Sequence, residues 1–318
     1  MGPEPVVSRE LLIDSVMKTL PEFDARTLDD IRRSLGREID EAGPAALDAL
    51  NERLTSIGSD WSYYPKNALA SRVHELLADR MLQPGSGLHG LENLRRVAGK
   101  AVVIFANHLS YADANLLEVL LRRSGAAGLA DRLTVIAGPK VYSSLRRRFS
   151  SMCFGTIRTP QSSDLSTEDA VMTPREVARA ARQSVDVARE KLRQGGALLV
   201  FGEGTRSRSG GLRRMLVGAA RYLEEPSSWV LPVGIVGTEA LFPVGVDRLR
   251  PSEVAVRVGP PFRASRLMRG AGRDRRLAMD TIGLALAALL PREYRGEYGD
   301  GAADLGSATR LLRALYDA

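Results

Sequence analysis

After about residue 100, short apolar runs alternate with longer stretches of helical spacing, and no other pattern in this chain limits its fold as strongly. Unbroken apolar runs are typical of strands buried on both faces, as in parallel sheets with helical crossovers. We therefore predict an α/β fold with a mainly parallel mixed sheet flanked by helices. The expected strands are Ala101–Ala106, Leu133–Ala137, Gly155–Thr159, Ala197–Phe201, Trp229–Val236 and Val254–Val258, and the expected helices between them are Tyr111–Arg123, Pro174–Gln194 and Arg213–Glu225.

The beginning of the chain has a different pattern. From Ser8 to about Leu82, apolar residues recur every three or four positions, and prolines fall where helices would end. This predicts a small N-terminal all-helical domain of three or four helices over residues 1–83, followed by an α/β domain over residues 84–318 that includes the C-terminal helices. The helices expected to close the second domain are near Ala264–Leu290 and Ala303–Tyr316.

Three segments fit neither pattern. Gln83–Gly90 is rich in glycine and is expected to be a linker. The polar stretch Gln161–Thr173 is long for a connection, and we interpret it as a mobile loop that could act as a lid. Val141–Phe154 mixes a basic cluster with apolar residues. We favour an amphipathic core helix with one solvent-exposed face there. The alternatives are a segment that lies on a membrane surface and a segment that frames an acyl-chain groove.

The composition narrows the class of protein. With 44% hydrophobic and 26% charged residues, the chain is expected to be globular. No apolar stretch approaches the roughly 20 residues that cross a bilayer, and the N-terminus lacks a secretory signal, so we expect a cytoplasmic protein. Cys153 is the only cysteine, which excludes an intramolecular disulfide and leaves too few ligands for a Cys/His zinc site. The net charge of +7 suits phosphorylated metabolites, anionic lipid or nucleic acid, unless the arginines simply lie on solvated faces.

The sequence NHLSYAD, from Asn107 to Asp113, lies between an expected strand and an expected helix. His108 and Asp113 would not share one face of a continuous helix. They meet only if His108 lies in the turn and Asp113 in the first helical turn, with Ser110 as N-cap. Asp113 would then fix the tautomer of His108 and leave its second nitrogen as a general base. In the alternative, Ser110 and Asp113 form only a capping box, and His108 has no catalytic role.

A second polar stretch follows another expected strand. The segment Leu198–Gly211, LLVFGEGTRSRSGG, ends a buried run in glycines and then offers Arg206 and Arg208. Ligands of α/β folds bind at the carboxyl ends of parallel strands, and glycines let backbone N–H groups approach an anion. Lys140 and Arg158 also follow expected strands, so these basic groups are expected to converge on one rim of the sheet. The alternative is an ordinary basic turn with solvated side chains.

Taken together and in this order, three blocks resemble the signatures of the glycerophospholipid acyltransferase family, which includes glycerol-3-phosphate and lysophosphatidate acyltransferases. They are NHLSYAD at Asn107–Asp113, FGEGTRSRSG at Phe201–Gly210 and LPVGIVGTE at Leu231–Glu239. The segment Val135–Pro160 resembles the family's connection between the first two blocks, and GLENL at Gly90–Leu94 resembles its entry. The resemblance covers about residues 87–259.

The resemblance implies that His108 is the base, that Asp113 holds it, and that no covalent acyl-enzyme forms. The residues expected to bind the substrate phosphate are Arg158, Arg206, Arg208 and Lys140, and those expected to shape the loop are Glu203, Gly204 and Thr205. The sequence departs from the family pattern at Gly202, where proline is usual, and at Val217, where a basic residue is common. Because of these departures, we expect the arginines to contribute more of the binding to the substrate phosphate.

We therefore expect an acyltransferase that moves a fatty acyl group from acyl-CoA or acyl carrier protein to a hydroxyl of glycerol 3-phosphate, in phospholipid biosynthesis. The helical N-terminal region and the pair Arg206 and Arg208 resemble soluble plastid-type glycerol-3-phosphate acyltransferases. The blocks look nearer to lysophosphatidate acyltransferases, so lysophosphatidate remains the alternative acceptor. An acyl thioester is already activated, and no metal or other cofactor is expected.

The remaining alternative is a non-catalytic protein whose basic surface binds an anionic membrane, and such binding would weaken steeply with salt. That alternative does not explain why His108, Asp113 and the arginine-rich loop occur in one family order. We expect no nucleic-acid partner. The expected location is the cytoplasm, with peripheral contact at the inner membrane surface as a further expectation.

Overall fold

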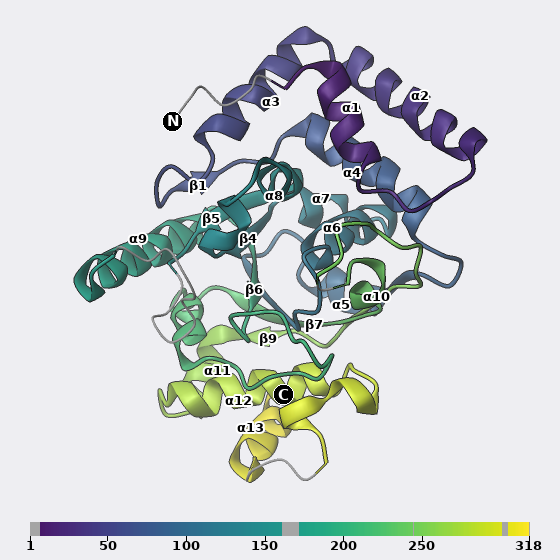
Figure 1. The fold of residues 1–318 in the computed structure, drawn as a ribbon. Coiled ribbons are helices and arrows are strands. Elements are labelled where there is room, and N and C mark those ends of the chain that lie inside the picture. The colour runs from purple at the N-terminus through teal and green to yellow at the C-terminus, as the bar shows by residue number, and fades with distance from the viewer. Residues whose placement is uncertain (1–6, 161–171, 244, 301–304, 318) are drawn as a thin grey trace.

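A computed structural model describes residues 7–160, 172–243, 245–300 and 305–317 of the chain. Its centre is a nine-stranded sheet in the order β1-β5-β4-β6-β3-β7-β8-β2, with β9 pairing to β7 (Figure 1). The strands are β1 (Tyr63–Tyr64), β2 (Gly87–His89), β3 (Val102–Ala106), β4 (Leu133–Ala137), β5 (Gly155–Arg158), β6 (Ala197–Phe201), β7 (Trp229–Val236), β8 (Ala255–Val258) and β9 (Phe262–Arg263).

The pairing confirms the predicted mainly parallel mixed sheet. Strands β5, β4, β6, β3 and β7 pair in parallel, as do β2 and β8. The antiparallel pairs are β1 with β5, β7 with β8 and β7 with β9. All the strands expected from the apolar runs are present, with bounds that differ by at most a residue or so.

Three short strands were not expected, and one of them corrects a prediction. The segment Gln83–Gly90 is not simply a linker, because Gly87–His89 forms the edge strand β2 beside β8. Gly90 follows with a φ of +87°, and a Cβ there would lie 2.2 Å from the carbonyl oxygen of Val258, so the glycine is needed for this close approach. Strands as short as β1 and β9 carry too few residues for a period to be recognised.

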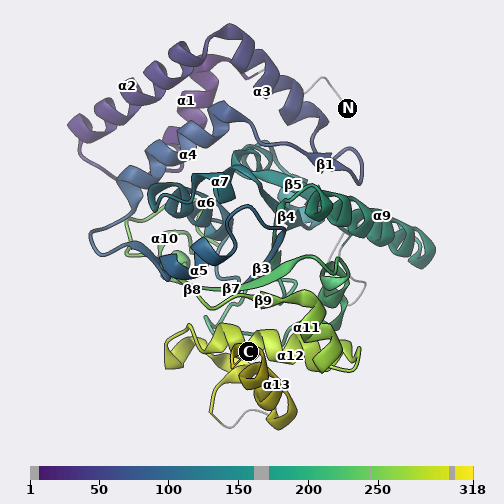
Figure 2. The ribbon, with the colours of Figure 1, turned by 180° about the vertical axis from the view of Figure 1, so that it is seen from behind.

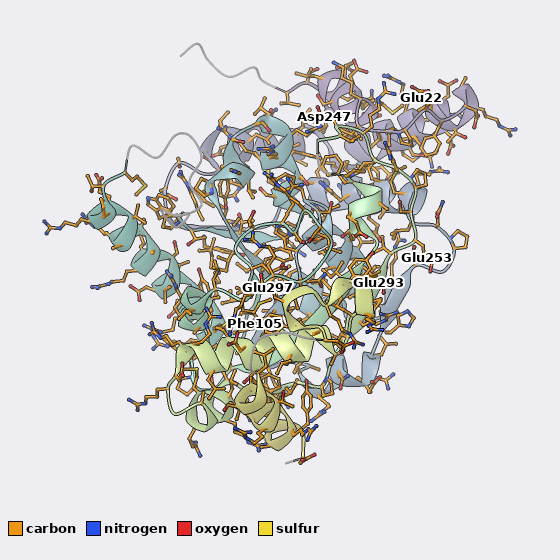
Figure 3. All side chains as sticks on the ribbon, turned by 60° about the horizontal axis from the view of Figure 1, so that its bottom comes forward. Glu22, Phe105, Asp247, Glu253, Glu293 and Glu297 are labelled. Atoms are coloured by element: carbon orange, nitrogen blue, oxygen red, sulfur yellow. The ribbon has the colours of Figure 1, made fainter. Side chains whose placement is uncertain are left out.

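The two faces of the sheet belong to two hydrophobic clusters, as the period of two along a strand requires. In β3, Val102 and Ile104 face the cluster formed with the N-terminal helices, whereas Val103 and Phe105 face the cluster formed with the C-terminal helices. Phe105 is completely buried and lies deep among the side chains in Figure 3. The sheet is therefore the middle of three layers.

Helices α1 to α4 confirm the predicted helical N-terminus and lie on one side of the sheet, opposite α11 to α13 (Figures 1 and 2). The side chains of Ser8, Asp24 and Asn67 cap α1, α2 and α4. The buried residues of these helices share one cluster with the sheet. The division into domains at residue 83 stays a prediction. The bounds on this side are α1 (Arg9–Met17), α2 (Ala25–Ala42), α3 (Pro44–Ser56), α4 (Ala68–Met81), α5 (Leu91–Arg96), α6 (Asp113–Arg123), α7 (Ala127–Asp131) and α8 (Leu145–Ser150).

The later helices correct two predictions. Residues 213–225 were expected to be helical, but only a 3-10 helix at Val217–Leu223 forms there. The expected helix Ala264–Leu290 is divided at Arg273, which has a φ of +66°. The bounds are α9 (Pro174–Arg193), α10 (Thr238–Leu241), α11 (Ala264–Gly270), α12 (Arg275–Ala287) and α13 (Gly306–Tyr316), with further 3-10 turns at Pro139–Tyr142, Ser151–Cys153, Arg292–Tyr294 and Gly296–Tyr298.

Two further expectations concern the connecting segments. Val141–Phe154 is not one amphipathic helix, because it is divided between a 3-10 turn, α8 and a second 3-10 turn. Most of the polar stretch Gln161–Thr173 lies outside the described residues. In the described parts of the chain, no helix is long and apolar enough to cross a membrane.

Candidate active site

The candidate site lies at the carboxyl edge of the parallel strands. Strands β3 and β6 are neighbours, so the turn after β3, which carries His108, lies beside the loop after β6, which carries Glu203. Strand β7 pairs with the other side of β3 and ends next to Thr238. Loops at this edge are where α/β folds gather their ligands. Three segments far apart in the sequence are thereby brought together.

The structure brings His108 and Asp113 together as the sequence predicted. Nδ1 of His108 lies 2.7 Å from Oδ2 of Asp113, within hydrogen-bonding distance. The Asp113 side chain is completely buried, whereas that of His108 is 16% exposed. Within the described chain, Nε2 of His108 has no hydrogen-bond partner. The arrangement leaves one imidazole nitrogen bound to a carboxylate and the other open for a proton transfer.

Asp113 is held by more than the histidine. Its Oδ2 also accepts the backbone N–H groups of Leu109 at 2.8 Å and Ser110 at 3.0 Å, and Thr238 donates its hydroxyl to Oδ1. A carboxylate with this many donors is fixed in position. The same side chain therefore serves both the backbone of the turn and His108, so the two interpretations of this segment are not exclusive.

Ser110 does not act as the predicted N-cap. Helix α6 begins at Asp113 with Ala112 at the N-cap position, and no side chain caps it. The hydroxyl of Ser110 instead donates to the carbonyl of Phe242 and accepts the N–H of Ala112. The turn between β3 and α6 is therefore tied to the segment after α10, which sequence spacing could not reveal.

Glu203 joins the turn that carries His108 to the arginine-rich loop. Its two oxygens accept the backbone N–H groups of His108, at 2.7 Å, and Arg213, at 2.8 Å. Burial is the main cause that raises the pKa of Glu203 to about 7, while the two N–H donors act in the opposite direction. The loop is also bound to the turn through Ser207, whose N–H donates to the carbonyl of His108 at 2.7 Å.

The glycines of this loop have distinct roles. Gly204 has a φ of +73°, which turns the chain just after Glu203. A Cβ on Gly202 would lie 2.4 Å from the sulfur of Met215, a buried residue that returns against the loop. Met215 therefore fills the space beside Gly202, which gives a physical reason for glycine at a position where the family usually has proline. Thr205 is partly buried in the same loop.

The four predicted phosphate-binding cations do not have equivalent surroundings. Arg206 stacks over the ring of Tyr111, with its guanidinium carbon 3.7 Å from the ring centroid. Lys140 and Arg208 are exposed, and no described carboxylate pairs with any of these three. Lys140 follows β4, and Arg206 and Arg208 follow β6, and the role of all three in phosphate binding stays a prediction.

Arg158 differs from the other three. Its guanidinium donates to the carbonyl of Gly58 and lies 4.3 Å from the ring centroid of Trp61. The ring of Tyr142 packs on the same guanidinium. Arg158 is thus directed toward the segment between α3 and β1. Strands β4 and β6 separate β5 from β3, so its described contacts are away from His108.

Three residues that the sequence did not single out contact His108, Asp113 or the end of β7. Phe201 stacks on the imidazole of His108, with ring centroids 4.1 Å apart. Asn107 exchanges two hydrogen bonds with the backbone of Ile235, and Thr238 holds Asp113. All three lie within the blocks that carried the resemblance, but only the neighbouring strands reveal what they contact. Cys153, His74 and His89 form no described contact with His108 or Asp113. Cys153 is buried, and burial raises its pKa.

The chain is similar in sequence to one protein family and in fold to a solved structure. Residues 86–236 match the family model described as Acyltransferase. No curated protein matches the chain significantly. Among solved structures, the chain is similar to the crystal structure of the 1-acyl-sn-glycerophosphate (LPA) acyltransferase PlsC from Thermotoga maritima. The identity is 17%, the TM-score is 0.47, and the alignment covers 89% of this chain and 96% of that one.

Proposed function

We propose that this chain transfers a fatty acyl group to a hydroxyl of glycerol 3-phosphate, because residues 86–236 match the family model described as Acyltransferase. The donor in this proposal is acyl-CoA or acyl carrier protein. The observation that supports it most directly is the pair His108 and Asp113, with 2.7 Å between Nδ1 and Oδ2 and a free Nε2.

The chemistry follows from this geometry. Nε2 of His108 takes the proton of the acceptor hydroxyl, while Asp113 holds the Nδ1–H tautomer and stabilises the imidazolium. The hydroxyl oxygen forms a bond to the thioester carbonyl carbon, and the tetrahedral intermediate then loses the thiolate. The thiolate receives the proton from His108, so the base is regenerated without a covalent acyl-enzyme. The proposal includes no metal or other cofactor, since the thioester is already activated.

Lysophosphatidate is the second candidate acceptor. It offers a free hydroxyl and the same phosphate group, and it adds an acyl chain. Leu216 and Val217 are each 39% exposed, and the N–H of Leu216 donates to the carbonyl of Gly202 in the site loop. Two exposed apolar side chains beside the site suit contact with an acyl chain of the donor or of such an acceptor. The proposal also includes a cytoplasmic location with peripheral contact to anionic membrane, for which the net charge of +7 is favourable.

The first test measures free-thiol release by the purified protein with palmitoyl-CoA and either acceptor. We expect release that depends on one acceptor and that falls by about a hundredfold or more in His108→Ala, because a general base contributes roughly that much. His89→Ala is the matched control, since His89 is exposed on the edge strand β2. It should retain wild-type activity.

The outcomes separate the alternatives. Release with glycerol 3-phosphate alone supports the first acceptor, and release with lysophosphatidate alone supports the second. If neither gives release, the same comparison is made with acyl carrier protein as the donor. Failure there as well, or equal activity of His108→Ala and wild type, would contradict the proposed function and favour a protein that only binds anionic surfaces.

A further inference from the structure

We propose that Arg147 is a further binding residue for the phosphate group of the acceptor, acting together with Arg206 across the ring of Tyr111. This inference rests on the proposed function and adds a residue that the family motifs did not mark. Its basis is a pair of guanidinium groups that share one aromatic ring beside the base, without an acidic partner.

The ring of Tyr111 is the meeting point. Its centroid lies 3.7 Å from the guanidinium carbon of Arg206 and 5.1 Å from that of Arg147. Tyr111 belongs to the turn after β3, Arg206 to the loop after β6, and Arg147 to α8. The strand order places β4, which precedes α8, next to β6. Three separate segments at the carboxyl edge of the sheet therefore contribute to one cationic cluster.

The three consecutive arginines of α8 have three different environments. Arg146 forms an ion pair with Asp247, with 2.6 Å between Nη2 and Oδ1. Figure 3 labels Asp247 on the side of the molecule where the N-terminal helices and Glu22 lie. Arg148 donates to the carbonyls of Tyr142 and Leu54 and so packs toward α3.

Arg147 has a different set of contacts. Its Nη1 donates to the carbonyl of Lys140, at 3.2 Å, and to the hydroxyl of Ser143, at 2.9 Å. No carboxylate of the described residues forms an ion pair with it or with Arg206. These hydrogen bonds orient the guanidinium without neutralising its charge, and its other nitrogens remain available to an anion.

Two like charges on one ring repel each other, and the negative face of the ring offsets only part of that cost. A phosphate dianion bound between them would neutralise both, and the planar guanidinium fork matches phosphate oxygens.

The cluster is also close to the base along the chain and in space, because Tyr111 lies between His108 and Asp113 and Ser207 binds the His108 carbonyl. In a glycerol phosphate, only a short carbon chain separates the reacting hydroxyl from the phosphate. The acceptor phosphate therefore suits this cluster better than the distant phosphates of an acyl-CoA donor.

The test compares Arg147→Gln and Arg206→Gln with the matched control Arg146→Gln. Arg146 lies on the same helix, but its partner Asp247 is 85% exposed, so the control should lose little. We expect Arg147→Gln to raise the KM for the acceptor about tenfold or more, as the loss of a charge-assisted contact implies, with a smaller change in kcat and in the KM for the donor. Arg147→Lys keeps the charge without the fork and should give an intermediate KM.

A second readout does not depend on turnover. Inorganic phosphate and glycerol 3-phosphate are titrated separately into the protein without donor, and the heat of binding is measured. Weaker binding of both in Arg147→Gln, but not in Arg146→Gln, supports the inference even if acyl transfer fails. Equal binding and equal acceptor KM in Arg147→Gln and wild type would overturn it. An increase confined to the KM of acyl-CoA would overturn the assignment to the acceptor, and if Arg147→Gln does not fold, the same two outcomes are read from Arg147→Lys.

Discussion

At the scale of single residues, Glu203 determines how the turn that carries His108 and the arginine-rich loop are joined. One buried carboxylate receives backbone N–H groups from both segments, and burial raises its pKa from 4.5 to about 7. The folded chain therefore binds this proton at higher pH than the unfolded chain does. The stability linked to Glu203 is fully present below about pH 4.5 and is lost as the pH rises toward 7.

This sign leads to a prediction for Glu203→Gln, whose side chain stays neutral at every pH. Between pH 4.5 and 7 the wild-type protein should lose up to about 3 kcal/mol of unfolding free energy that the variant does not lose. The measurement is denaturant unfolding of both proteins across this pH range. Parallel curves of stability against pH would contradict the prediction. The variant should also bind only one of the two N–H groups well, because its amide nitrogen cannot accept a hydrogen bond.

At the scale of elements, Asn107 extends the pairing of β3 and β7 beyond the last residues that pair through their backbones. Its amide donates to the carbonyl of Ile235 at 2.8 Å and accepts the Ile235 N–H at 2.7 Å. This exchange holds the turn that carries His108 against the end of β7, where Thr238 reaches Asp113. Asn107 is 1% exposed, so water cannot replace either bond.

Asn107→Asp should therefore be costly although it changes only one atom of the side chain. The donor to Ile235 is lost and a charge is placed at a position that is 1% exposed, and we expect the free energy of unfolding at neutral pH to fall by about 2–4 kcal/mol. Chemical denaturation measures this change. Asn51→Asp is the control, since Asn51 makes a similar pair of bonds to Val7 but is only partly buried. It should reduce stability less, because water can solvate its charge, and an equal loss would contradict the role given to burial.

At the scale of the whole molecule, the N-terminal helices are attached to the sheet by packing and by specific polar contacts. Arg158 at the end of β5 reaches the carbonyl of Gly58 and the ring of Trp61, and Arg148 reaches the carbonyl of Leu54. These contacts join α3 and the segment after it to β5 and α8. Loss of one of them should therefore affect the attachment of the helices more than the chemistry.

For Arg158→Gln, we accordingly expect a lower melting temperature and an acceptor KM close to that of wild type. Loss of a buried bond to a charged group corresponds to about 1–3 kcal/mol. Thermal unfolding and steady-state kinetics of the same preparation provide both values. A normal melting temperature with a raised acceptor KM would instead support the family's expectation that Arg158 binds the substrate phosphate.

The sequence by itself determined the principal strands and the helical N-terminus, and it offered the pairing of His108 with Asp113 as one of two interpretations. These features depend on short-range periodicity or on residues that lie close together in the sequence at the end of one strand. In both cases, the local sequence is enough to predict the arrangement. The order of the blocks also carried the resemblance to the glycerophospholipid acyltransferases.

Only the tertiary structure decided which segments meet at that strand end. Strands β1, β2 and β9 form because longer strands offer them an edge, not because of a pattern of their own. Thr238, Glu203 and Arg147 contact the turn after β3 from across the sheet, and Arg158 turns toward the N-terminal helices instead. The spacing of residues along the sequence does not reveal which side chains the strand order brings together. The order of strands in a sheet depends on how the whole chain packs.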